Sequence, residues 1–139
     1  MHTTNNSGIV PAAMRGINAT NGRGSFTADA YPAGFTRYGA PYIGRLPRKL
    51  AEILDERFRQ GAVVQVIYSY GTPIAWLDAG AWIIPNVRYS ATTSAKHQSQ
   101  LYRLPGEIRI PWDEGMNGYM GLLNGTKHPY TWEELRKYS

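Results

Sequence analysis

The chain has 139 residues, of which 42% are hydrophobic, no cysteine, and a formal net charge of +5 at pH 7. This length suits one compact domain with loose segments. The lack of cysteine excludes disulfides, a thiolate nucleophile and thiolate metal sites. The positive charge favours anionic partners such as nucleic acid. No apolar run is long enough to span a membrane, and the first residues lack the features of a secretory signal, so no membrane partner is expected.

The N-terminal segment, residues 1–45, is rich in Gly, Asn, Thr and Ala and has no sustained periodicity. We therefore expect an irregular arm. It carries four arginines against Asp29 alone, and its aromatic residues are interleaved with Gly and Arg. Such an arm either packs on its own domain or binds a partner, for example single-stranded nucleic acid that stacks on its aromatic rings. The candidate arm contacts are Arg15, Arg23, Arg37, Tyr38 and Arg45.

Residues 46–61 predict a helix. Pro47 suits its first turn, and Gly61 suits the position just after its end. Its apolar residues recur at helical spacing and form one stripe, whereas charges of both signs cover the other face. We expect the stripe to pack on the following strands. The stripe consists of Leu50, Ile53, Leu54 and Phe58.

The stretch 63–90 predicts a β-hairpin. At its start, alternate positions are apolar or aromatic, and many of these residues suit a half-buried strand. Gly71 and Pro73 interrupt the pattern, so the first strand either kinks there or breaks in two. Gly80 provides a tight connection to a second strand that ends near Ser90.

A helix is predicted to follow the hairpin and to end near Leu104. Its start is rich in hydroxyl side chains, of which Thr92, Thr93 or Ser94 is well suited to cap the helix. The first turn presents free backbone N–H groups, these hydroxyls and the side chains of Lys96 and His97, a combination that suits an anion or a phosphate. The alternative is that the hydroxyls only cap the helix while Lys96 and His97 face water. The hydroxyl residues are Ser90, Thr92, Thr93 and Ser94.

Two segments of this region resemble a known pattern. The sequence Ser-Tyr-Gly-Thr-Pro-Ile-Ala at 69–75, followed by Tyr-Ser-Ala-Thr-Thr-Ser at 89–94 and Lys-His-Gln at 96–98, is similar to a small uncharacterised domain of phage and mobile-element proteins, especially those of actinobacterial phages. In that pattern the basic residue and His directly follow Thr-Thr-Ser, whereas here Ala95 intervenes. The resemblance implies a phage or mobile-element context without an established activity.

The C-terminal part has fewer signals. Residues 107–112 alternate in a way that predicts a short strand. The apolar residues among positions 112–123 either complete the core or dock on a partner, and we favour the core. Thr131 and Glu134 match a capping box, which predicts a short terminal helix.

The sequence offers little support for catalysis. Of the histidines, only His97 lies near a hydroxyl cluster, and no Gly-x-Ser-x-Gly motif accompanies it. No His-x-x-x-His or Asp-x-Asp spacing occurs, so we expect no metal site. No glycine-rich phosphate loop occurs, so we expect no nucleotide cofactor.

These observations predict an α+β fold in which an antiparallel β-hairpin or small sheet is flanked by two helices. A short C-terminal helix and an irregular N-terminal arm complete it. The predicted division is an arm at 1–45 and a small α+β domain at 46–139.

We expect a small, basic, non-enzymatic phage or mobile-element binding protein in the host cytoplasm or virion, with no cofactor and an open oligomeric state. Nucleic acid is the favoured partner, contacted at its phosphates. The alternatives are a protein-interaction or virion-associated protein whose arm orders on a host or phage protein, and a hydrolase that uses Ser90, Ser94 and His97. The predicted binding residues are Tyr70, Thr72, Arg88, Tyr89, Ser90, Thr92, Thr93, Ser94, Lys96 and His97.

Overall fold

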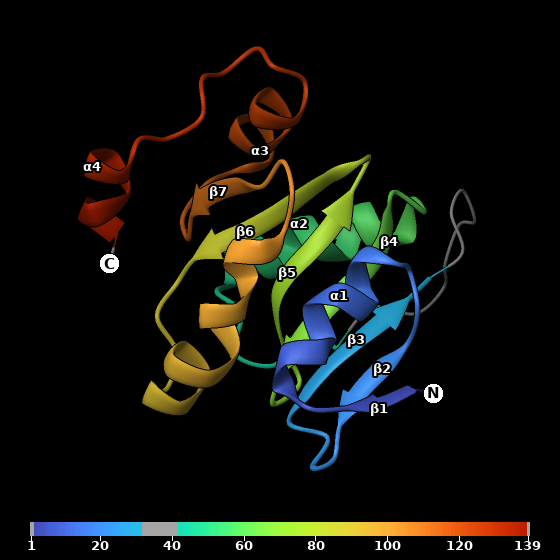
Figure 1. The fold of residues 1–139 in the computed structure, drawn as a ribbon. Helices are drawn as coiled ribbons and strands as arrows, with labels where there is room; N and C mark the ends of the chain where they lie inside the picture. The colour runs from blue at the N-terminus through green and yellow to red at the C-terminus, as the bar shows by residue number, and fades with distance from the viewer. Residues whose placement is uncertain (1, 32–41, 139) are drawn as a thin grey trace.

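The computed structural model of the chain describes residues 2–31 and 42–138, whose strands form one seven-stranded mixed sheet (Figure 1). The strands lie side by side in chain order. Neighbours are antiparallel except for the first pair and the last pair, which are parallel. The strands are β1 (His2–Thr4), β2 (Ala19–Asn21), β3 (Phe26–Ala30), β4 (Val63–Ser69), β5 (Thr72–Asp78), β6 (Ala81–Asn86) and β7 (Ile108–Pro111).

The helical segments cover both faces of this sheet. The α-helices are α1 (Ile9–Met14), α2 (Arg48–Arg59), α3 (Met116–Leu123) and α4 (Trp132–Leu135). A π-helical turn η2 (Thr93–His97) continues into the 3₁₀ turns of η3 (Gln98–Arg103), and shorter 3₁₀ turns occur at η1 (Asn6–Gly8) and η4 (Arg136–Tyr138). Among residues 2–31 and 42–138, no helix combines the length and the apolar character that crossing a bilayer requires.

The predicted fold, a hairpin or small sheet flanked by two helices, is wrong because the sheet has seven strands. The expected first strand breaks into β4 and β5 at Tyr70 and Gly71, which have φ angles of 50° and 77°. Positive φ at both central residues is typical of tight hairpin turns, because it matches the twist of the paired strands. The result is a three-stranded meander rather than one hairpin.

The predicted irregular N-terminal arm is also wrong for the described residues. Residues 2–30 supply β1, α1, β2 and β3, and β3 pairs with β4 from Phe26 opposite Ser69 to Ala30 opposite Gln65. The first two strands have three residues each and are largely polar, so they carry no alternating pattern. β1 and β2 therefore form because they pair with neighbouring strands of the sheet.

Each face of the sheet has its own hydrophobic core. On one face, α1 and Leu101 of η3 pack with Phe26 and Ile67 of the strands. On the other face, α2 and α3 pack with Val66 and Trp76. Figure 1 shows α1 in front of the sheet and α2 behind it. Because β4 is buried on both sides, its apolar positions do not alternate as they do in a half-exposed strand.

Helix α2 confirms the prediction for 46–61. Pro47 precedes its first residue, and Gly61 adopts a φ of 77° just after its end, where a residue with a side chain is strained. The predicted apolar stripe is buried against the sheet.

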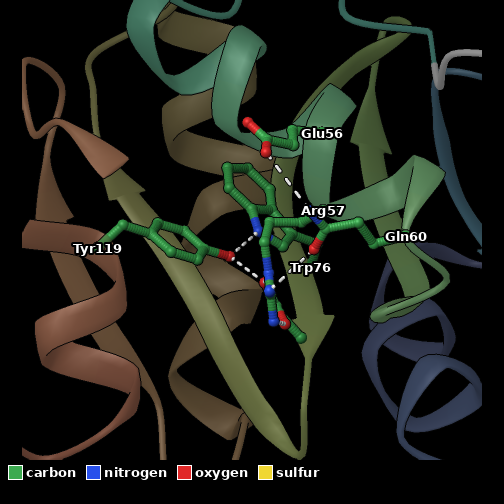
Figure 2. A network of polar contacts seen from close by, with 6 residues as sticks. Glu56, Arg57, Gln60, Trp76 and Tyr119 are labelled. Carbon is green, nitrogen blue, oxygen red and sulfur yellow. Dashed lines mark hydrogen bonds and ion pairs between the residues drawn. The ribbon is translucent and has the colours of Figure 1, made fainter. Parts of the chain in front are cut away.

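A buried polar network joins α2, β5 and α3 (Figure 2). Asp78, which has no exposed surface, accepts hydrogen bonds from Arg57 Nε at 2.9 Å and Nη2 at 2.8 Å. The Tyr119 hydroxyl donates to the same carboxylate at 2.7 Å and accepts from Trp76 Nε1 at 2.8 Å. Every polar group of this cluster therefore has a partner, as buried charges require.

The C-terminal segment combines two confirmed predictions with one missed helix. The strand expected at 107–112 is β7, and the capping box of Thr131 and Glu134 begins α4. Helix α3 was not predicted, since its two internal glycines weaken the helical pattern. Most of the apolar residues of this region complete the core as expected, with Tyr119 and Leu122 buried, whereas Trp112 is 45% exposed.

Candidate functional site

Two pockets adjoin at the turn between β4 and β5, and Tyr70 and Thr92 line both of them. The hydroxyl pocket has a volume of about 550 Å³, and the amide pocket has a volume of about 630 Å³. The hydroxyl pocket is lined by Tyr42, Gly44, Arg45, Ser69, Tyr70, Thr72, Tyr89, Ser90, Thr92 and Thr93. The amide pocket is lined by Asn5, Asn6, Ser7, Asn21, Gly22, Arg23, Ser25, Tyr70, Thr92, Lys96, His97 and Gln100.

A chain of hydrogen bonds runs from the hydroxyl pocket to His97 of the amide pocket. Ser90 Oγ accepts from the Thr93 N–H and donates to Thr93 Oγ1, both at 3.2 Å. Thr93 Oγ1 lies 2.9 Å from Ser69 Oγ, which lies 2.6 Å from His97 Nδ1. The chain connects the end of β4 to η2, and it is buried at Ser69, Thr93 and His97. Ser90 thus caps the helical turn, in place of the later hydroxyl residues expected for that role.

His97 is held between aromatic rings. Its imidazole stacks on Phe26 with centroids 4.4 Å apart and planes 9° apart, and Tyr70 lies against it at 5.6 Å. Only 2% of His97 is exposed. This burial, followed by the charge of Lys96, lowers the pKa of His97. The ring is therefore neutral at pH 7.

Acid is expected to destabilise the protein through His97. The usual pKa of 6.5 is lowered on folding, so between the two values the unfolded chain binds more protons. The stability that neutral His97 contributes is complete above about pH 6.5 and is lost as the pH falls below that value. Urea unfolding at about pH 7.5 and about pH 5 should show a smaller loss in His97→Asn than in the unmodified protein. Equal losses would assign the acid sensitivity to other groups.

Asn21 shapes the amide pocket. Its Nδ2 donates to Asn6 Oδ1 and to Ser25 Oγ, each at 2.9 Å, and its Oδ1 accepts from the Ser25 N–H at 2.9 Å. These bonds brace the loop between β2 and β3 against η1. The loop carries the exposed Arg23 at the pocket rim.

The charged groups of both pockets have one sign. Arg45 lines the hydroxyl pocket, Arg23 and Lys96 line the amide pocket, and all three are exposed. Neither lining, over the described residues, includes a carboxylate. The surface therefore attracts anions, and it offers a neutral donor or acceptor at nearly every other polar position.

The structure brings together most of the predicted binding residues. The hydroxyl pocket gathers Tyr70, Thr72, Tyr89, Ser90, Thr92, Thr93 and Arg45, and the amide pocket gathers Lys96, His97 and Arg23.

Five predicted residues are not placed in these pockets. Arg15 and Arg88 are exposed and line neither one. Ser94 is exposed and donates to Gln98 Oε1 at 3.0 Å. Arg37 and Tyr38 lie outside the described residues. The binding role of every predicted residue stays a prediction.

Several pocket residues were missed by the sequence-based prediction. Ser69 is the most informative, because it connects η2 to β4. A serine at the end of a largely apolar strand was an available signal, since a buried hydroxyl needs a partner. Asn21, and Phe26, which stacks on His97 without lining either pocket, had no comparable signal, because they lie in the segment expected to be irregular.

The geometry bears on the hydrolase alternative. Ser69, rather than Ser90 or Ser94, contacts His97, and Ser90 reaches the imidazole only through Thr93 and Ser69. Ser69 is only 2% exposed, so a substrate has little access to its hydroxyl. Among residues 2–31 and 42–138, no three His, Asp or Glu side chains gather as metal ligands would.

Comparison with known proteins places the chain in a family. A family model described as "Family of unknown function (DUF8033)" matches residues 16–112. The match runs from just before β2 to just after β7 and includes most of both pocket linings. Comparisons with curated proteins and with solved structures gave no significant match. Because the family model covers more than half of the 139 residues, the chain belongs to the DUF8033 family, whose function is unknown.

Proposed function

We propose that this protein is a small, non-enzymatic module that binds single-stranded nucleic acid across the hydroxyl and amide pockets. The observation that carries the proposal is the junction of two cation-bearing, carboxylate-free pockets at one exposed tyrosine. Proteins that bind single strands combine a positive groove with aromatic rings on which bases stack. Both components occur here on one surface.

The cations suit a phosphate backbone. Arg45 lies on one side of Tyr70, in the hydroxyl pocket, while Arg23 and Lys96 lie in the amide pocket. A strand that crosses Tyr70 meets positive charge before and after the ring. Neutral hydroxyls of the first pocket, such as Ser90 and Thr92, add donors for phosphate oxygens.

Tyr70 is the stacking residue in this proposal. It is 58% exposed although it occupies a tight turn with a φ of 50°, a conformation that is unfavourable for a bulky residue. Strained residues of this kind cluster at functional sites. Tyr42, which is 69% exposed, lines the hydroxyl pocket and offers a second ring.

The phage or mobile-element context remains part of the proposal, supported by the sequence pattern alone. The protein-interaction alternative also stays a prediction. Tyrosine and arginine are frequent in protein interfaces, so the same surface suits a protein ligand.

Fluorescence anisotropy with short single-stranded DNA and RNA, over a salt series, tests the proposal. We expect binding at low salt that weakens as salt rises, with a slope of about −0.7 for each phosphate contacted. Arg45→Ala should make the slope less negative by about 0.7, because it removes one such contact. A duplex of the same sequence should bind more weakly, since its bases are not free to stack.

Arg48→Ala is the matched control. It removes the same charge from α2, where the Arg48 side chain is 92% exposed and lines neither pocket. This variant should keep the salt slope of the unmodified protein. If no single strand binds at low salt, the proposed function is wrong. If Arg48→Ala and Arg45→Ala have equal effects, binding is not localised at the pockets.

A further inference from the structure

The amide pocket contains a buried group with a fixed orientation. Only 2% of the His97 surface is exposed. The stacked ring of Phe26 and the tilted ring of Tyr70 restrict the rotation of its imidazole. It nevertheless lines the amide pocket. A side chain so enclosed presents only one atom or edge to a ligand.

The hydrogen-bond chain favours one tautomer of the His97 imidazole. Ser90 Oγ accepts from the Thr93 N–H, so its own proton goes to Thr93 Oγ1. Thr93 Oγ1 lies 2.9 Å from Ser69 Oγ, and Ser69 Oγ lies 2.6 Å from His97 Nδ1. If each hydroxyl passes its hydrogen on in the direction that Ser90 starts, Nδ1 is the acceptor at the end of the chain and the neutral imidazole carries its hydrogen on Nε2, which is the tautomer that lets Nε2 donate to a ligand.

Nε2 is the ring nitrogen that the hydrogen-bond chain leaves for a ligand, because Nδ1 is the nitrogen that contacts Ser69. Ser69 is bonded at Nδ1, the ring faces contact Phe26 and Tyr70, and Lys96 is a cation that cannot accept a hydrogen bond. An acceptor atom of a ligand in the amide pocket can therefore pair with Nε2.

We infer that the amide pocket holds a nucleobase, whose ring nitrogen or carbonyl oxygen accepts a hydrogen bond from His97 Nε2. The inference rests on the proposed binding of single-stranded nucleic acid and names what this pocket takes. Hydrogen bonds from an oriented neutral side chain are typical of base-edge recognition in single strands. Tyr70 lines both pockets, and its ring can stack on the same base.

Two observations favour a base over a phosphate as the partner of His97. The imidazole is neutral, whereas phosphate groups are bound best by cations, and the pocket places those at its exposed rim as Arg23 and Lys96. The remaining lining is mostly neutral amides and hydroxyls, including Asn21, which match the donors and acceptors of base edges.

Two substitutions separate the ring nitrogens. In His97→Asn the side-chain oxygen can still accept from Ser69, but the pocket donor is gone. In His97→Gln an amide N–H can reach the position of Nε2. We expect His97→Asn to weaken binding of single-stranded dA, dC and dT oligomers about threefold to tenfold, the range for one neutral hydrogen bond, and His97→Gln to restore part of the loss.

Abasic oligomers of the same length provide the decisive comparison. They keep the phosphates but lack bases, so the unmodified protein and His97→Asn should bind them equally. An equal loss on both kinds of oligomer would show that His97 contacts the backbone, and no loss on either would show no contact. Each of these results overturns the inference while leaving the proposed function intact. Failure of the unmodified protein to bind any oligomer overturns both.

A measurement on the unmodified protein covers the case in which a variant does not fold. Nitrogen-15 NMR of the imidazole reports both ring nitrogens. We expect the hydrogen on Nε2 of His97 and a shift of that signal on adding a short single strand, without a shift on adding the abasic strand. A hydrogen on Nδ1, or the same shift with both strands, contradicts the inference.

Discussion

Replacing Asp78 by alanine is expected to lower the free energy of unfolding by about 3–5 kcal/mol. The carboxylate has no exposed surface and accepts from Arg57 twice and from Tyr119 once. Its removal leaves a guanidinium whose side chain is only 14% exposed, and it takes away the acceptor of the Tyr119 hydroxyl. Hydrogen bonding to Asp78 raises the pKa of Arg57, and the guanidinium stays charged at neutral pH even without that contribution, because arginine is not deprotonated in proteins. Urea unfolding at neutral pH measures the loss.

Asp55→Ala is the control for this experiment. Asp55 pairs with Arg59 at 3.0 Å in an ion pair whose side chains are 38% and 46% exposed. Exposed pairs contribute about 0.2–1 kcal/mol, so the loss should be several times smaller. The loss of unfolding free energy in Tyr119→Phe should lie between those of Asp78→Ala and Asp55→Ala, at about 1–3 kcal/mol, because Trp76 Nε1 then loses its acceptor. Similar losses for Asp78→Ala and Asp55→Ala would contradict the assignment of the network as the main polar link between α2, β5 and α3.

Tyr70→Asn is expected to have opposite effects on folding and on binding. Asparagine before glycine is the favoured pair in a tight hairpin turn with positive φ, so relief at Tyr70 should stabilise the protein by about 1 kcal/mol. The bond from the Tyr70 N–H to the Ser25 carbonyl at 2.8 Å is unaffected. Loss of one stacked base should weaken single-strand binding about fivefold to 150-fold. Thermal unfolding and anisotropy measure the two effects.

The second hairpin provides a matched control for Tyr70→Asn. Ala79 and Gly80 connect β5 to β6 with φ angles of 50° and 85°, so Ala79→Asn introduces the same residue in the same conformation. Ala79 lines neither pocket. Ala79→Asn should stabilise the protein without weakening binding. If Tyr70→Asn binds as tightly as the unmodified protein, Tyr70 is not a stacking residue. If Tyr70→Asn is less stable than the unmodified protein, the ring contact between Tyr70 and His97 contributes more stability than the backbone strain at Tyr70 costs.

The candidate site combines buried, hydrogen-bonded residues with exposed residues that a ligand can contact. Ser69, Thr93 and His97 are buried and hydrogen-bonded. Tyr70 and the cationic side chains that line the pockets are exposed to solvent. Fixing the buried members in advance lowers the entropy cost of binding.

Local signals in the sequence determined several elements by themselves. The apolar stripe of α2, the glycine after its end and the capping box of α4 each involve residues within a few positions of one another. Short-range spacing suffices for such features, because a helix satisfies its own hydrogen bonds. The hydroxyl residues around Ser90 were identified as a candidate site for the same reason, since they are neighbours in the chain.

Only the tertiary structure decided the width of the sheet and the composition of the site. β1 pairs with β2 through residues 17 positions apart, and neither strand has an apolar pattern that indicates a partner. Ser69 meets His97 across 28 positions, and Trp76 meets Tyr119 across 43. These contacts exist because separate segments bury apolar surface on the two faces of one sheet, and that burial depends on the whole chain at once.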